Sequence, residues 1–252
     1  MAKRLITLTA LFAILALLSL HTATDASACD KCAKHNASNK TQAKEAPHNV
    51  APEGFTALFN GKDIDGWIVK SGKCTYEVKD GIITGTTVKG SPNTFLTTSK
   101  EYGDFELKFD VLLHDKGLNS GCQIRSQIVK DDKWGGRLGG PQCEIEAGPG
   151  QSGYIYGEAT GKGWLSPEPK SKDKAVNSHQ YFVNGEWNQY HIIAKGNNIK
   201  TFINGHAVAD LDLPGDIAEK FSKGVLGLQV HAVGGDPKWR VSWRNIYIKE
   251  LK

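Results

Sequence analysis

The sequence predicts an all-β protein, an antiparallel two-sheet jelly-roll sandwich with one short helix. Many short segments alternate apolar and polar side chains, and turn-forming pairs such as Asp80-Gly81 and Asn204-Gly205 separate them. The chain also has 28 glycines and a single methionine, which favours tight turns over a helical bundle. So many strands in one unit limit their exposed edges by packing as two sheets.

Each element is expected from its own local pattern. Eight of the expected strands are Cys74–Val78, Ile82–Thr86, Phe105–Leu113, Gln123–Val129, Trp187–Ala194, Ile199–Ile203, Val225–His231 and Val241–Ile248. The segment Asp216–Ser222, which follows a Pro-Gly pair, predicts a short amphipathic helix. Lys130–Pro141 and Gly157–Gln180 fit no regular strand, so we expect two long loops of the kind that bind ligands.

The N-terminus predicts export. Lys3-Arg4 precedes an apolar run, Leu5–Leu20, and small residues end at Ala28, so residues 1–28 are expected to be a signal peptide. The run is shorter than the roughly 18 residues of a membrane span, and no span is expected. We therefore expect a periplasmic or extracellular protein. A lipoprotein anchored at Cys29 is the alternative, because the residues before it resemble a degraded lipoprotein box.

Composition divides the rest of the chain into a linker and one domain. Residues 29–52 carry almost no large apolar side chain and are expected to be a disordered linker, whereas 53–252 form the folded unit. The net charge of +4 comes from interspersed charges, so a nucleic-acid partner is not expected.

Five cysteines remain after signal cleavage: Cys29, Cys32, Cys74, Cys122 and Cys143. The first two are expected to form a tail disulfide or a tether, since no second pair follows to complete a zinc site. Cys122 and Cys143 both point toward the expected core. They form a disulfide if their strands are adjacent and their geometry allows it; buried free thiols are the alternative.

Polar side chains share one face of three expected strands. Alternation places the apolar residues of each strand in the core and leaves the polar ones on the other face. These polar residues are Gln123, Arg125, Gln142, Glu144, Glu146, Gln229 and His231. If the strands are neighbours, the residues form one polar floor in a concave sheet. Taken singly, each is also compatible with an ordinary solvated exterior. Trp134 and Trp164 lie in the expected loops, where a ring can stack on a sugar.

An ordered set of motifs resembles the bacterial 3-keto-disaccharide hydrolase family over about residues 53–251. The motifs are FTALFNGKDIDGW at 55–67, NSGCQIR at 119–125, SGYIYG at 152–157, GEWNQYHI at 185–192, ING at 203–205, GLQVH at 227–231 and WRNIYIKEL at 243–251. The resemblance implies a concanavalin-like sandwich of the lectin and glucanase type. It also implies an exported enzyme that cleaves glycosides whose sugar is oxidised to a ketone at C3.

The family pattern transfers to this chain in part. It falls on Asn119, Arg125, Glu144, Gln229 and His231. This sequence departs from it with a second carboxylate at position 146 and with glycine at position 148, where the family has an acid.

Chemistry suggests how such a site would work. A ketone at C3 acidifies the hydrogen on C2, so the glycosidic bond can break by elimination, and water can then add. His231 is the expected base, and Glu144 is the expected acid, with its pKa raised by Glu146; the two could exchange roles. Arg125 and Gln229 are the expected enolate stabilisers. Glu146, Gln123, Asn119, Trp134 and Trp164 complete the expected substrate site.

No cofactor is expected, because no metal-ligand spacing occurs in the sequence; a metal ion acting on the ketone is the alternative. Two other functions also remain open. One is a non-catalytic lectin-like module, for which aromatic and amide side chains suffice. The other is a retaining β-glucanase, since Glu144 and Glu146 share a strand face, although glycine stands at the third acid's position. In every case the expected partner is an oligosaccharide or glycoside.

Overall fold

The computed structural model describes residues 48–147, 151–167 and 179–252. The expected signal peptide, Cys29, Cys32 and position 148 lie outside the described residues. Within the described part of the chain, no helix is long and apolar enough to cross a membrane.

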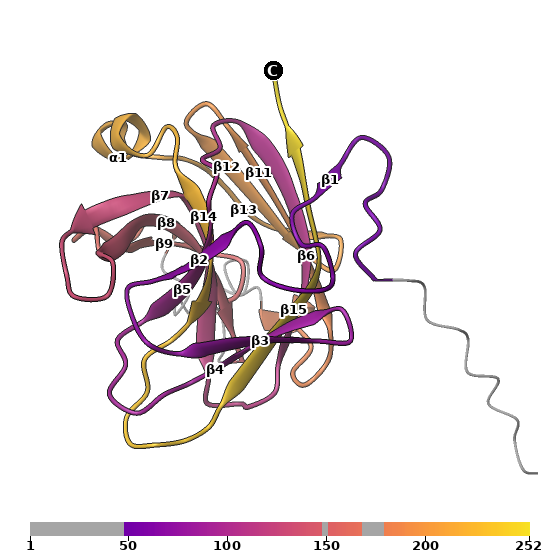
Figure 1. Ribbon diagram of the computed structural model, residues 1–252. Coiled ribbons are helices and arrows are strands. Elements are labelled where there is room, and N and C mark those ends of the chain that lie inside the picture. Colours follow the sequence, from indigo (N-terminus) through magenta and orange to yellow (C-terminus); the bar gives the residue numbers. More distant parts are fainter. Residues whose placement is uncertain (1–47, 148–150, 168–178) are drawn as a thin grey trace, which may run out of the picture. The chain divides into compact units, whose positions relative to one another are not determined.

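Two antiparallel sheets make up the described fold (Figure 1), which confirms the two-sheet sandwich. The eight-stranded sheet has the order β13 (His206–Asp212), β12 (Asn198–Ile203), β11 (Asn188–Lys195), β6 (Phe105–Leu113), β15 (Arg240–Glu250), β4 (Ile82–Thr86) and β3 (Thr75–Lys79), with β1 (Thr56–Ala57) paired to β15. The seven-stranded sheet has the order β10 (Gly163–Trp164), β9 (Ile155–Glu158), β8 (Arg137–Glu146), β7 (Asn119–Lys130), β14 (Val225–Val230), β5 (Thr94–Thr98) and β2 (Trp67–Lys70).

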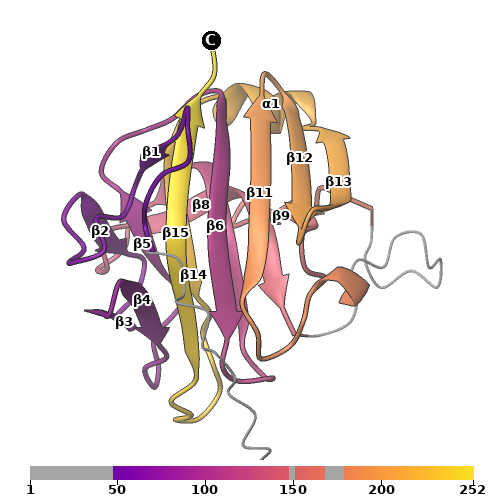
Figure 2. The same ribbon diagram turned by 90° about the vertical axis from the view of Figure 1, so that its right-hand side faces the viewer.

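The eight-stranded sheet shows the alternation from which its strands were expected. Figure 2 shows β15, β6, β11, β12 and β13 side by side in this sheet. Along β6 and β11, buried residues alternate with more exposed ones over most of each strand. The short helix α1 (Gly215–Lys220) begins one residue before its expected start.

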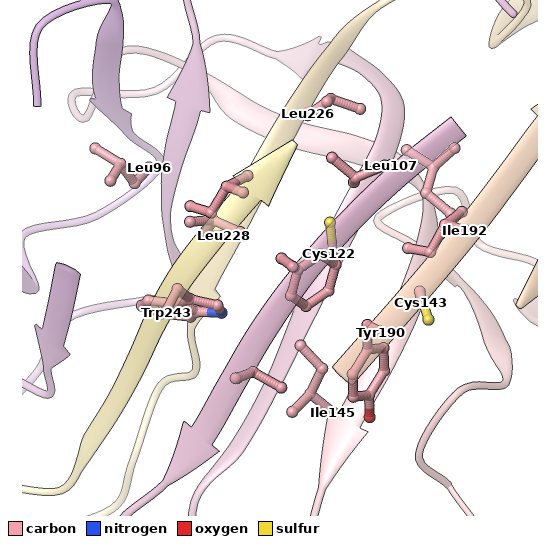
Figure 3. Close-up of a cluster of buried hydrophobic side chains, with 14 of the residues drawn as sticks. Leu96, Leu107, Cys122, Cys143, Ile145, Tyr190, Ile192, Leu226, Leu228 and Trp243 are labelled. Atoms are coloured by element: carbon pink, nitrogen blue, oxygen red, sulfur yellow. The ribbon is translucent and has the colours of Figure 1, made fainter. Parts of the chain in front are cut away.

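The core fills the space between the sheets. Leucines of β14 face Leu107 and Ile192 of the other sheet, with the Trp243 ring fully buried among them (Figure 3). Cys122 and Cys143 stand directly opposite each other on β7 and β8, as the disulfide expectation required. Both are free, buried thiols, so the second of the two alternatives holds. Burial raises the pKa of the Cys122 thiol to about 12 and keeps it protonated.

The expected loop over Lys130–Pro141 is wrong in its second half, because β8 already begins at Arg137. Gly139 explains why composition was misleading here. A Cβ at this position would lie 2.9 Å from the carbonyl oxygen of Glu158 on β9 and 2.9 Å from a methyl of Val129 on β7. The glycine therefore permits close strand packing and does not mark a loop.

Contacts of the folded unit begin inside the expected linker. The backbone N–H of Asn49 donates to Oδ1 of Asn245 at 2.8 Å, and its side-chain amide donates to the carbonyl of Gly81 at 2.9 Å. This short segment is thus tied to β15 and to the β3–β4 turn.

Candidate functional site

Strand register aligns one row of residues across five neighbouring strands of the seven-stranded sheet. The row, from β14 through β7, β8 and β9 to β10, consists of Gly227, Gln123, Gln142, Tyr156 and Trp164. The expected neighbourhood of the three polar strands is therefore confirmed: β7 lies between β8 and β14. Their polar faces form a continuous surface on the side of the sheet away from the core.

Gln142 is the centre of a buried hydrogen-bond network on this surface. Its Oε1 accepts from Nε2 of Gln123 at 2.5 Å and from Nε2 of Gln229 at 3.1 Å. Its own Nε2 donates to Oε1 of Glu144 at 2.6 Å. Since both neighbouring amides occupy the oxygen of Gln142, its NH2 group is directed at the carboxyl group.

Gly121 makes room for this arrangement. It is opposite Glu144 in the β7–β8 register, and a Cβ on it would lie only 2.5 Å from Cδ of Gln142. A side chain here would push the Gln142 amide away from its partners. The glycine in the NSGCQIR motif is thus explained by the space that the hydrogen-bond network needs, and not by a turn.

Glu144 is a buried carboxyl group, with 5% of its surface exposed. Asn119 donates to its Oε2 at 3.3 Å, in addition to the bond from Gln142. Burial raises the pKa of Glu144 to about 8, and these two hydrogen bonds only partly offset the rise. Nearby Glu158 and Glu146 contribute smaller increases. At neutral pH the group is mostly protonated and can act as an acid.

His231 follows β14 and lies in the same cleft as Glu144. Its Nδ1 is 2.6 Å from the carbonyl oxygen of Ala232. A carbonyl can only accept, so Nδ1 carries the proton in this contact, and Nε2 of the neutral ring keeps its lone pair. The imidazole is therefore in the tautomer that can accept a proton at Nε2.

The cleft above the network has a volume of about 230 Å³. Its lining residues are Asn119, Gln142, Glu144, Gln151, Tyr156, Glu158, Trp164 and His231. Of the residues selected from sequence, the structure brings together Asn119, Glu144, Trp164 and His231. Gln123 and Gln229 are fully buried and support the cleft through Gln142, and Glu146 is not among the lining residues.

The expectation that Arg125 lies on this polar face is wrong. Its guanidinium donates to the carbonyls of Gly103 and Gly196, both at 2.6 Å, and pairs with Asp104 at 2.9 Å. The β7–β8 register shifts between Gln123 and Gln127, and Arg125 itself has φ of 52°. This bulge breaks the alternation on which the expectation rested.

Trp134 is also outside the cleft. It lies in the turn of the β7–β8 hairpin, between Lys130 and Arg137, whereas Asn119 and Glu146 pair at the hairpin's open end. Its carbonyl accepts from the N–H of Ser71, and Lys133 lies over its ring at 5.2 Å from the centroid. Trp164, in contrast, contacts the ring of Tyr156 edge-on, with centroids 5.3 Å apart.

Sequence reasoning missed Gln142, Gln151, Tyr156 and Glu158 as site residues. Gln142 was assigned to the correct face but not to the site. Tyr156 and Glu158 lie on β9, which alternates buried Ile155 and Gly157 with these two larger side chains. That short alternating pattern was a usable signal, but the expected loop began at Gly157 and divided it, so no strand was expected here.

A metal centre is not evident in the described ranges, where no group of three or more His, Cys, Asp or Glu side chains is placed to hold an ion. The buried carboxyl group has amide partners instead.

Comparison with known proteins identifies the family. A model of the 3-keto-alpha-glucoside-1,2-lyase-like domain matches residues 54–249. The chain belongs to this family. A search of curated proteins finds no match.

Solved structures agree with this assignment. A protein of Parabacteroides distasonis, named as a candidate glycosyl hydrolase, is 25% identical; the match has a TM-score of 0.56 and covers 81% of this chain and 100% of the other. A Bacillus subtilis protein of unknown function with a galectin-like fold is 11% identical, again with a TM-score of 0.56, over 80% of this chain and 97% of the other. The second match concerns the fold alone. The family and the first relative together support a carbohydrate-active protein.

Proposed function

We propose that this protein cleaves 3-keto-glycosides by elimination across C1–C2, followed by hydration. The observation that carries the proposal is a buried Glu144, whose pKa burial raises to about 8, in one cleft with His231, whose Nδ1 contact leaves Nε2 to accept a proton. Elimination next to a ketone needs such a pair, an acid for the leaving oxygen and a base for the hydrogen on C2. The family description supports the substrate class.

The chemical step balances without an added reagent. Nε2 of His231 takes the proton from C2, and the electron pair left there becomes an enolate with the C3 ketone. The enolate then re-forms the ketone and expels the C1 oxygen, which receives the Glu144 proton. The product is an unsaturated 3-keto sugar plus the free alcohol. Addition of water across the C1–C2 double bond gives the free 3-keto sugar and returns a solvent hydrogen to C2.

Neutral donors replace Arg125 and the fully buried Gln229 in this scheme. Gln151, through its amide, and Tyr156, through its hydroxyl, line the cleft and have donors not yet assigned. We assign stabilisation of the C3 oxygen to them, since donors positioned around a developing oxyanion stabilise it in the transition state. Trp164, which packs edge-on against Tyr156, provides a face for the sugar ring.

A retaining glucanase needs a second carboxylate beside the first. Glu146, the partner expected from sequence, is outside the cleft lining, and the other carboxylate there, Glu158, is ion-paired with Arg137. This arrangement favours a single acid working with a histidine. The lectin-like alternative has no use for a carboxyl group held protonated by burial.

The test is turnover of 3-keto-glucosides carrying deuterium at C2, in both anomeric forms, beside the unoxidised glucosides. We expect slower release of the labelled sugar, loss of the label to water and no release from the unoxidised compounds. Turnover with full retention of deuterium would contradict elimination. Binding without turnover would show a lectin, and release from an unoxidised β-glucan would show a glucanase.

We also propose that the protein is exported and cleaved after Ala28, as its first residues indicate. Intact mass and N-terminal sequencing of protein from its native host test this. An added acyl mass on Cys29 would instead show a lipoprotein.

A further inference from the structure

Asn93 connects the base and a carboxylate of the cleft through one side-chain amide. It precedes β5, and the register pairs Thr94 with Val230, so Asn93 lies beside the chain at His231. Its Oδ1 accepts the backbone N–H of Ala232 at 2.8 Å. Its Nδ2 donates to Oε1 of Glu158 at 3.2 Å.

The orientation of this amide follows from its partners. A backbone N–H can only donate, and an ionised carboxylate can only accept, so the Asn93 oxygen must face Ala232 and its nitrogen must face Glu158. Asparagine carries both functions at this length, whereas aspartate lacks the donor. Arg137 pairs with the same Glu158 oxygen and fixes the carboxylate.

Ala232 transmits this arrangement to the imidazole. Its N–H is held by Asn93, and its carbonyl accepts the Nδ1 proton of His231. The tautomer of a histidine is set by the hydrogen bond that its other ring nitrogen makes. A displaced Ala232 carbonyl would therefore release the Nδ1 proton and allow the proton to occupy Nε2, where the ring can no longer accept one.

We propose that Asn93 is a positioning residue that holds His231 in its Nδ1-protonated tautomer, and that the Glu158–Arg137 pair fixes Asn93. The inference rests on the proposed function for its effect on rate. Its structural claim, the state of the imidazole, stands on the hydrogen bonds alone. It also gives Glu158 a supporting task, since the elimination scheme needs no second carboxylate.

The decisive measurement is the ¹⁵N NMR spectrum of the His231 ring at a pH where the ring is neutral, in the full-length protein. We expect the wild type to show the Nδ1-protonated tautomer alone and Asn93→Ala to show a mixture. Asn60→Ala is the matched control, because Asn60 also accepts backbone N–H groups and donates to a carboxylate, Asp63, but is exposed and outside the cleft. This control should leave the His231 spectrum unchanged.

A reversed pair separates positioning from general damage. Asn93→Asp keeps the acceptor for Ala232 but places a carboxylate against Glu158, so it should disturb the tautomer. Adding Glu158→Gln removes this repulsion and leaves the new carboxylate facing a neutral amide and the Arg137 guanidinium, so the double variant should be closer to the wild-type spectrum than Asn93→Asp alone. With a 3-keto-glucoside, Asn93→Ala should lower kcat about tenfold with little change in KM.

A pure Nδ1-protonated tautomer in folded Asn93→Ala overturns the inference, whatever the rate. The same holds if the double variant is no closer to wild type than Asn93→Asp. A tautomer that responds as expected, in a protein that does not turn over the keto-glucoside, supports the positioning role while the proposed function fails.

Discussion

The two halves of β7 use charged and polar residues in opposite ways. In the first half, Asn119 and Gln123 face away from the core and build the cleft and its support. In the second half, which begins inside the bulge, Arg125 is 1% exposed and is bound to backbone carbonyls and Asp104. The alternation of core-facing and outward-facing side chains thus holds as far as Gln123 and fails two residues later, at Arg125.

The difference shows that buried polar residues of β7 have two separate roles, one in the cleft and one in stabilising the fold. The amides of the first half bind one another and leave a carboxyl group protonated beside an open cleft. The guanidinium of the second half uses its donors within the protein and has no open face. Changes in the first half should therefore reduce activity with small effects on folding, and changes at Arg125 should do the reverse.

Arg125→Met should have the largest effect, a loss of about 3–5 kcal/mol in the free energy of unfolding. The substitution removes two hydrogen bonds to backbone carbonyls and the ion pair with the partly exposed Asp104, and a lost hydrogen bond of a charged group costs about 1.5–3 kcal/mol. Urea unfolding measures the loss. Arg240→Met, at an exposed arginine of β15, is the control. The activity of the folded fraction should be unchanged. A loss of turnover with normal stability would contradict this prediction and assign Arg125 to the active site.

Glu144→Gln and His231→Ala should each lower the rate of 3-keto-glycoside cleavage by about 100-fold or more, since each removes one proton-transfer group. Glutamine can still form hydrogen bonds with Gln142 and Asn119. The free energy of unfolding of the Glu144→Gln variant should therefore stay close to that of the wild type near neutral pH. Steady-state kinetics with circular dichroism spectra test both parts. Full activity of either variant would contradict the assignment.

The pH dependence of the cleavage rate separates the contribution of Glu144 from that of His231. Its pKa of about 8 means that the acid form is lost as pH rises through that value. Activity should fall about tenfold per pH unit well above pH 8. The residual activity of Glu144→Gln should lack this alkaline decline. A decline that persists in the variant would assign the titration to another group.

Regular segments of the fold could be predicted from the sequence, because each strand of a sandwich has a core face and a second face with its own pattern. The eight expected strands correspond to strands of the structure, with ends that differ by up to a few residues. β8 was recognised only from Gln142 onward. Its first half contains Gly139 and Gly140, where neighbouring strands approach closely, and composition does not distinguish such glycines from those of loops.

The site was predictable where alternation holds and not where it is interrupted. Glu144 and His231 follow from alternation together with the family resemblance, and the structure brings them into one cleft. Arg125 failed because a bulge reverses the direction of a side chain without a strong sequence signal. The role of Asn93 could not be seen for a different reason: it depends on a hydrogen bond between the side chain just before β5 and the backbone just after β14, which are far apart in the sequence.

Two tryptophans give the smallest and most selective prediction. Both were expected to stack on sugar, but only Trp164 lines the cleft, while Trp134 lies in the hairpin turn. A stacking contact contributes roughly 1 kcal/mol, so Trp164→Ala should raise KM about 5-fold with little change in kcat. Trp134→Ala should change KM by less than about twofold on the same scale. Titration with a non-cleavable sugar, followed by tryptophan fluorescence, checks the same order in binding. A larger effect at Trp134 would mean that substrate extends along the whole hairpin, and the contrast between the two halves of β7 would then describe one long binding surface.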